Sequence, residues 1–172
     1  MTSVVLIGVG NPARGDDGLG PALAERVEDL CLPGVTVESD YQLEPEHAVP
    51  MGSHDVVIIA DAAVSGPAPF GISLIEARPD TSFSTHGLDP GALLALAQLI
   101  HKRPIEAYLL TVRGIELEPF SEKLSDEARR NLDEALAFLV PFLCAEPRRV
   151  GVLRRAARPA RAACLVSSED GR

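Results

Sequence analysis

Two neighbouring carboxylates lie in a glycine-rich stretch near the start of the chain. Asp16 and Asp17 belong to the run G-V-G-N-P-A-R-G-D-D-G-L-G, which spans residues 8–20. Adjacent carboxylates are costly in a tight loop unless a positive charge shares the site. An acidic residue just before a helix can also cap that helix and interact favourably with its dipole. We therefore expect one member of the pair to act as a cap and the other to be free for chemistry.

Two further side chains could join that free carboxylate. Asp61 directly follows the apolar run Val-Val-Ile-Ile-Ala, so it would stand at the C-terminal end of a buried parallel strand, where such sheets bind ligands. His86 lies in a connection between a predicted strand and a predicted helix, at the same expected edge. Two carboxylates and one imidazole would form a three-ligand site for a divalent transition metal, with positions open for water or substrate. The alternative for each residue is an ordinary solvated loop position.

The elements that would position these residues alternate between strands and helices. Apolar runs predict strands over residues 4–9, 35–39, 56–60, 71–76 and 106–112. Helical periodicity predicts helices over residues 20–31, 90–101 and 125–143, the last with Ser125 as its N-cap. This alternation predicts an α/β fold, a three-layer sandwich in which a mainly parallel, twisted sheet of about five strands is flanked by helices.

Length and charge predict one domain followed by a tail. A chain of 172 residues fits a single domain, which we place at residues 1–146. Residues 147–172 carry seven arginines against two acidic residues and show no sustained helical period. They are predicted to form a basic, weakly ordered C-terminal tail. The alternative is a basic arm that docks on a partner or on a membrane surface.

The composition argues against several classes of partner. A net charge of −9 and the absence of tryptophan argue against nucleic acid. The opening residues are typical of a strand rather than a signal peptide, and no apolar run is long enough to span a membrane. Cys31, Cys144 and Cys164 are too far apart to form a zinc ribbon or a disulfide framework. We expect a cytoplasmic, monomeric protein with no nucleic-acid or membrane partner.

The glycine-rich stretch also matches a different kind of site. Residues 8–13 fit G-x-G-x-x-A, a dinucleotide-binding fingerprint, and Glu38 or Asp40 could act as the ribose-binding acid. That fingerprint requires a helix to begin among the glycines, with its amides facing a pyrophosphate. Here the same helix would contain a proline and several glycines, and two carboxylates would face the anion. A dinucleotide-binding oxidoreductase is therefore the less favoured alternative.

Three separate pieces of the sequence resemble the hydrogenase maturation endopeptidases. These pieces are VVLIGVGNPARGDDGLGPALAERV, DVVIIADAAVSG and FSTHGLDPGALLALA. They are similar to the family's opening strand and acidic turn, to its strand that ends in a metal-binding Asp, and to its metal-binding His before a helix. The ending TVRGIELEPFSEKLSDEA is similar to the last strand and closing helix, although Ser121-Glu122-Lys123 stands where a glycine is common. The likeness covers about residues 3–145.

The resemblance implies a site, a reaction and a partner. The family's three metal contacts carry over onto Asp17, Asp61 and His86, which become the expected metal ligands and catalytic residues. Members of the family cut a C-terminal extension from the large-subunit precursor of a [NiFe] hydrogenase after nickel has been inserted. The resemblance thus implies a peptidase whose nickel is borne by the substrate rather than bound permanently. Because no serine or cysteine nucleophile is evident, we expect water to attack the peptide directly.

Other functions are compatible with the same residues. A non-catalytic, nickel-sensing or chaperone-like binding protein could use the same three ligands, and so could a peptidase with an unrelated substrate. Residues 41–50 are similar to a family segment near the active-site cleft, where Gln42 and Glu44 could contact the substrate. An acidic, solvated loop is the alternative interpretation of that segment.

Overall fold

The protein is seen in a computed structural model that describes residues 2–78, 88–115, 120–145 and 150–157. Five strands form one sheet in the order β2-β1-β3-β5-β4, in which β4 is antiparallel to β5 and the other neighbouring strands are parallel. The strands are β1 (Val4–Val9), β2 (Val35–Asp40), β3 (Val56–Ala63), β4 (Phe70–Leu74) and β5 (Glu106–Arg113). The helices are α1 (Leu19–Glu28), α2 (Ala48–Ser53), α3 (Pro90–His101), α4 (Asp126–Cys144) and α5 (Gly151–Ala156).

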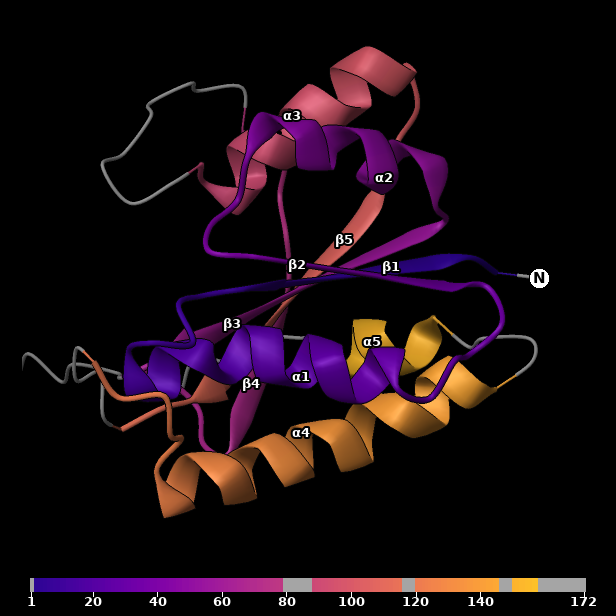
Figure 1. Cartoon of the computed structure of the whole chain (residues 1–172). Helices are drawn as coiled ribbons and strands as arrows, with labels where there is room; N and C mark the ends of the chain where they lie inside the picture. Colours follow the sequence, from indigo (N-terminus) through magenta and orange to yellow (C-terminus); the bar gives the residue numbers. More distant parts are fainter. Residues whose placement is uncertain (1, 79–87, 116–119, 146–149, 158–172) are drawn as a thin grey trace, which may run out of the picture.

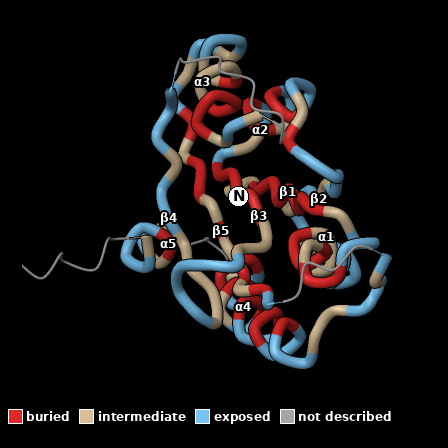
Figure 2. The backbone as a smooth tube through the Cα atoms, turned by 90° about the vertical axis from the view of Figure 1, so that its left-hand side faces the viewer, coloured by how far each residue is buried: buried red, intermediate tan, exposed pale blue. Residues whose placement is uncertain are grey.

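Helices cover both faces of the sheet, so the predicted three-layer α/β sandwich is confirmed. Helices α2 and α3 lie on one face, and α1, α4 and α5 lie on the other (Figure 1). Strand β1 shows why: its six apolar residues are buried, and alternate side chains enter separate cores. Leu6 packs with α1 and α4, whereas Ile7 packs with α2 and α3. Figure 2 shows buried backbone running through the central strands between these two layers.

Most predicted elements are present within a few residues of their expected bounds. Helix α3 spans Pro90–His101 as predicted, because Asp89 caps it by accepting hydrogen bonds from the amides of Gly91 (2.8 Å) and Ala92 (3.2 Å). Ser125 is the N-cap of α4, as predicted, and its hydroxyl accepts a hydrogen bond from the Ala128 amide at 3.1 Å.

Two short helices were not expected from the sequence. Helix α2 begins within residues 41–50, the segment for which a solvated loop was the alternative interpretation, and it buries Met51 against the α3 side of the sheet. Helix α5 lies within the stretch predicted to be a weakly ordered tail. It buries Leu153, and Arg154 donates from Nε to Glu106 Oε1 at 2.8 Å. Residues 150–157 therefore pack onto the domain, whereas residues 158–172, including Cys164, lie outside the described residues.

None of the helices in the described part of the chain is both long enough and apolar enough to cross a membrane.

Candidate active site

Close packing of glycines holds the loop between β1 and α1 against the sheet. A Cβ atom on Gly20 would lie 2.2 Å from the carbonyl oxygen of Val9 and 2.5 Å from that of Ala60. Gly10 has φ +140°, and a Cβ there would lie 2.0 Å from the Asp17 carbonyl oxygen. Only glycine tolerates that φ and these approaches. Helix α1 therefore starts directly on the ends of β1 and β3, and the turn that precedes it lies at the carboxyl edge of the parallel strands.

Asp16, in the 3-10 turn Gly15–Gly18, is fully buried and acts as a structural acceptor. Its Oδ2 accepts hydrogen bonds from the Ile115 amide at 2.7 Å and the Ser125 hydroxyl at 2.9 Å, and its Oδ1 accepts one from the Ser125 amide at 2.7 Å. Asp16 thus binds the start of α4. The sequence predicted that one aspartate of the pair caps the next helix, but the N-cap of α1 is Gly18, without a side-chain bond.

Asp17 is only partly buried, and its environment differs from that of Asp16. Its Oδ2 accepts a hydrogen bond from the amide of Asn11 at 3.1 Å. The Asn11 side chain in turn accepts a hydrogen bond from the Ala13 amide at 2.9 Å, so the loop is closed from within. The pair is therefore divided as the sequence suggested, into one structural carboxylate and one at the sheet edge.

Asp61 lies near the end of β3, beside Thr111 of β5, and accepts a hydrogen bond from the amide of Ala62 at 2.7 Å. Burial raises the pKa of its carboxyl group to about 6, against the smaller opposing effect of the Ala62 amide. The charge of Asp17 raises this pKa further. The turn before α1 and the end of β3, which are distant in sequence, therefore bring Asp17 and Asp61 close enough to repel each other. A bound cation would replace this repulsion with attraction.

His86, the third predicted ligand, lies outside the described residues. The chain is described again from Leu88, whose amide donates to the carbonyl of Leu43 at 3.3 Å, just after β2. Within residues 2–78, 88–115, 120–145 and 150–157, no three His, Cys, Asp or Glu side chains converge as metal ligands would. The structure thus brings Asp17 and Asp61 together, and His86 stays a prediction.

His47 and His54 have structural environments. His47 is buried, and its Nδ1 accepts a hydrogen bond from the Glu44 amide at 2.9 Å in a reciprocal capping box. Glu44 also accepts a hydrogen bond from the Gln42 side chain at 2.6 Å. His54 contacts the hydroxyl of Thr36 at 2.8 Å. Gln42 and Glu44 are thus bonded to each other within the segment after β2, and their suggested contact with substrate stays a prediction.

Sequence reasoning missed the residues whose hydrogen bonds support the loops of the site. Ile115 and Ser125 are 99 and 109 residues from Asp16, so no local pattern announces their hydrogen bonds. Arg113, at the end of β5, donates to the carbonyl oxygens of Val64 (3.1 Å) and Gly66, and so holds the loop that follows β3. The only local signal was the N-cap pattern at Ser125.

The geometry disfavours the dinucleotide site. Helix α1 begins at Leu19, well after the G-x-G-x-x-A residues, so its amides do not meet a ligand at those glycines. A groove of about 490 Å³ does adjoin the loop, between α1 and β2. Its lining includes the acidic side chains of Glu25, Glu38 and Glu122, which would repel a pyrophosphate.

Comparisons of sequence and of fold both find proteins of hydrogenase maturation. No family model matches this chain. The hydrogenase expression/formation protein HupM of Azotobacter chroococcum is 28% identical over 149 residues, which are 82% of this chain and 71% of that protein. The [NiFe] hydrogenase maturation protease HycI of Thermococcus kodakarensis is similar in structure, with a TM-score of 0.66, 22% identity, and coverage of 83% of this chain and 92% of that one.

A second solved structure has a higher sequence identity. The hydrogenase 2 maturation peptidase of a Thaumarchaeota archaeon is 26% identical, with a TM-score of 0.60, and covers 81% of this chain and 97% of its own. These likenesses confirm both the predicted architecture and the resemblance that the sequence motifs suggested.

Proposed function

We propose that this chain, which is similar in sequence and fold to the hydrogenase maturation endopeptidases, removes a C-terminal extension from the large-subunit precursor of a [NiFe] hydrogenase. The observation that carries the proposal is the coupled pair Asp17 and Asp61 at the carboxyl edge of the sheet. Ligand sites of open α/β sheets lie at this edge. The pair would bind a cation that arrives with a protein substrate.

Nickel in this proposal is part of the substrate. Asp17 and Asp61, with His86 as the third contact, would bind the nickel that the precursor carries, and so distinguish a loaded precursor from an empty one. Oxygen and imidazole donors suit a divalent transition metal. The raised pKa of Asp61 means that this group holds a proton part of the time near pH 6, and binding of a cation would release it.

Hydrolysis would then proceed by direct attack of water on the scissile carbonyl carbon. One of the two carboxylates would accept a proton from the water and return it to the leaving nitrogen, so that the peptide C–N bond breaks without a covalent enzyme intermediate.

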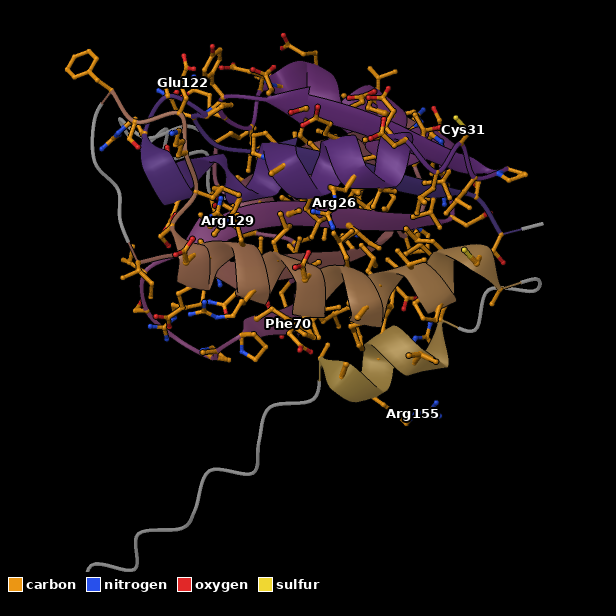
Figure 3. The ribbon with its side chains drawn as sticks, turned by 60° about the horizontal axis from the view of Figure 1, so that its bottom comes forward. Arg26, Cys31, Phe70, Glu122, Arg129 and Arg155 are labelled. Atoms are coloured by element: carbon orange, nitrogen blue, oxygen red, sulfur yellow. The ribbon has the colours of Figure 1, made fainter. Side chains whose placement is uncertain are left out.

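The described cysteines lie far from these carboxylates. Cys31 follows the C-terminal end of α1. Figure 3 shows it at the opposite end of the molecule from Glu122, which lies near the start of α1. Cys144 ends α4, a helix of 19 residues that begins beside Asp16. At 1.5 Å per residue, that helix places Cys144 roughly 28 Å from its start. Neither thiol can serve as a nucleophile at the site.

The decisive experiment is the mass of the large-subunit precursor before and after incubation with the protein. We expect loss of a C-terminal peptide from the nickel-loaded precursor and not from the metal-free precursor. His86→Ala should abolish the loss while circular dichroism shows an intact fold, and His54→Ala, at the histidine between the end of α2 and the start of β3, is the matched control.

Each outcome of this experiment has a distinct meaning. Full cleavage by folded His86→Ala would reject the assignment of His86. Binding of the nickel-loaded precursor by the wild-type protein without any cleavage would favour a non-catalytic nickel-sensing protein instead. The absence of both binding and cleavage would reject this class of substrate.

The proposal includes three expectations about the whole chain. We expect it to act as a monomer in the cytoplasm, and we expect residues 158–172, the part of the predicted tail beyond α5, to be dispensable for the reaction. Size-exclusion chromatography with light scattering tests the first, cell fractionation tests the second, and processing by a chain truncated after Ala157 tests the third.

A further inference from the structure

Two large apolar side chains are exposed in the connection between β5 and α4. Ile115 is 48% exposed and Phe120 is 98% exposed, so the aromatic ring gains almost nothing from packing within this chain. Phe120 also has φ +65°, a left-handed conformation that is uncommon for a bulky residue. The fold therefore holds a hydrophobic side chain in solvent, in a backbone conformation that costs free energy.

Hydrogen bonds attach Ile115, and Ser121 next to Phe120, to the loop that carries Asp17. The amide of Ile115 donates to Asp16 Oδ2 at 2.7 Å. Next to Phe120, the amide of Ser121 donates to the carbonyl of Ala13 at 3.1 Å, and the amide of Gly15 donates to the carbonyl of Ser121 at 2.6 Å. These bonds fix the backbone next to Phe120, so the exposed ring is held at the site by a defined support.

Other exposed apolar residues lie at the same edge of the sheet. Tyr41 comes directly after β2 and is 69% exposed, and Val64 comes directly after β3 and is 55% exposed. Together with Ile115 and Phe120 they come from three connections that leave the carboxyl ends of parallel strands. We call these four residues the apolar rim. Exposed apolar side chains gathered around a polar site are typical of protein-binding surfaces.

We propose that Phe120, supported by Ile115, is the main docking contact for an apolar patch on the folded precursor, beside the segment to be cut. This inference rests on the proposed function and adds a partner surface to it. A folded protein is the fitting occupant because the rim residues come from three connections at the sheet edge, one of them bonded to the loop that carries Asp17, whereas a short extension would not need contacts on three separate connections. Exposed aromatic anchors commonly contribute most of the binding free energy in such interfaces.

The test compares two substitutions at Phe120 with a control at Leu99, which is 74% exposed on α3 and outside the rim. Phe120→Ala and Phe120→Gly should raise KM for the nickel-loaded precursor about tenfold and leave kcat unchanged, because a docking contact acts equally on substrate and transition state. Leu99→Ala should leave both constants unchanged.

The glycine variant separates docking from stability. Glycine adopts φ +65° without strain, so Phe120→Gly should raise Tm while it weakens docking. A merely structural role for the ring would link lower stability to weaker binding instead.

The outcomes distinguish this inference from the proposed function. If the wild-type protein cleaves the precursor and both Phe120 variants keep its KM, the inference is overturned and the function stands. An unchanged KM with loss of a dimer on size-exclusion chromatography would assign the ring to contact between two copies. If the wild-type protein does not cleave, the proposed function itself has failed.

Discussion

The turn after β1 and the end of β3 each withdraw a carboxyl group from solvent, but they surround it differently. Among the described residues, Ile115 and Ser125 together donate three hydrogen bonds to Asp16. Within the part of the chain that the structure describes, Asp61 accepts one hydrogen bond, from the amide of Ala62, and the charge of Asp17 raises its pKa.

This difference separates a carboxylate that stabilises the fold from one that is available for chemistry. Hydrogen bonds to the charged form compensate Asp16 for its lost hydration. Asp61 lacks comparable compensation, so burial raises its pKa to about 6. A cation would supply what the protein does not, and perturbed carboxyl groups of this kind are concentrated at functional sites.

The largest effect is expected on processing of the precursor. Asp61→Asn and Asp17→Asn should each lower the rate by at least about 10²-fold, because the amide has neither the charge to bind a cation nor the basicity to accept a proton. The measurement is the rate of release of the C-terminal peptide, followed by mass spectrometry. Asp133→Asn, on the outer surface of α4, is the matched control and should process at the wild-type rate. Wild-type rates for both site variants would contradict the assignment of Asp17 and Asp61 to the reaction.

The next largest effect is expected on stability, at Asp16 in the turn after β1. Asp16→Ala should lower the free energy of unfolding by about 3 kcal/mol, since the amides of Ile115 and Ser125 would lose their buried acceptor. Urea unfolding at pH 7 measures this, with Asp17→Ala as the neighbouring control, for which we expect a much smaller loss. Equal losses at the two positions would contradict the division of the pair.

The fold was largely predictable from local patterns. The apolar run at residues 4–9 predicted a buried strand, and the helical periodicity of residues 90–101 predicted α3. The short helices α2 and α5 were not predictable because tertiary contacts stabilise them. Arg154 on Glu106 is one such contact, and the buried Leu153 is another.

The site was predictable only in part. The position of Asp61 after a buried strand placed it at the ligand-binding edge, and the structure supports that placement. The roles of Asp16 and Asp17 were not separable locally, because they depend on partners about one hundred residues away. His86 has no described environment, so its role as a ligand rests on the resemblance of its motif.

A smaller effect, of opposite sign, is expected for the stability of Asp61→Asn. The pKa of Asp61 rises from 3.8 to about 6 on folding, so the folded protein binds more protons than the unfolded chain between those values. The wild-type protein therefore loses stability as the pH rises from about 4 to about 6, and it keeps this penalty at higher pH.

Removing the charge should relieve that penalty. Asp61→Asn should unfold with a free energy on the order of 1–3 kcal/mol higher than wild type at pH 7 and equal to wild type at pH 4. Paired urea titrations at the two pH values measure this. A variant that is less stable than wild type at pH 7 would show that Asp61 contributes to the fold as Asp16 does.

The smallest effect is expected at a carboxylate that is neither buried nor part of the site. Asp133 of α4 accepts a hydrogen bond from Arg26 of α1 at 3.0 Å, and both side chains are more than half exposed; Figure 3 shows Arg26 between the two helices. Water and salt screen such a pair, so Asp133→Asn and Arg26→Gln should each change the free energy of unfolding by no more than about 0.5 kcal/mol. A double-mutant cycle in urea measures the coupling. A coupling above about 2 kcal/mol would show that an exposed, paired carboxylate stabilises the fold as strongly as a buried one. Hydrogen-bond partners alone, without burial, would then account for the difference between Asp16 and Asp61.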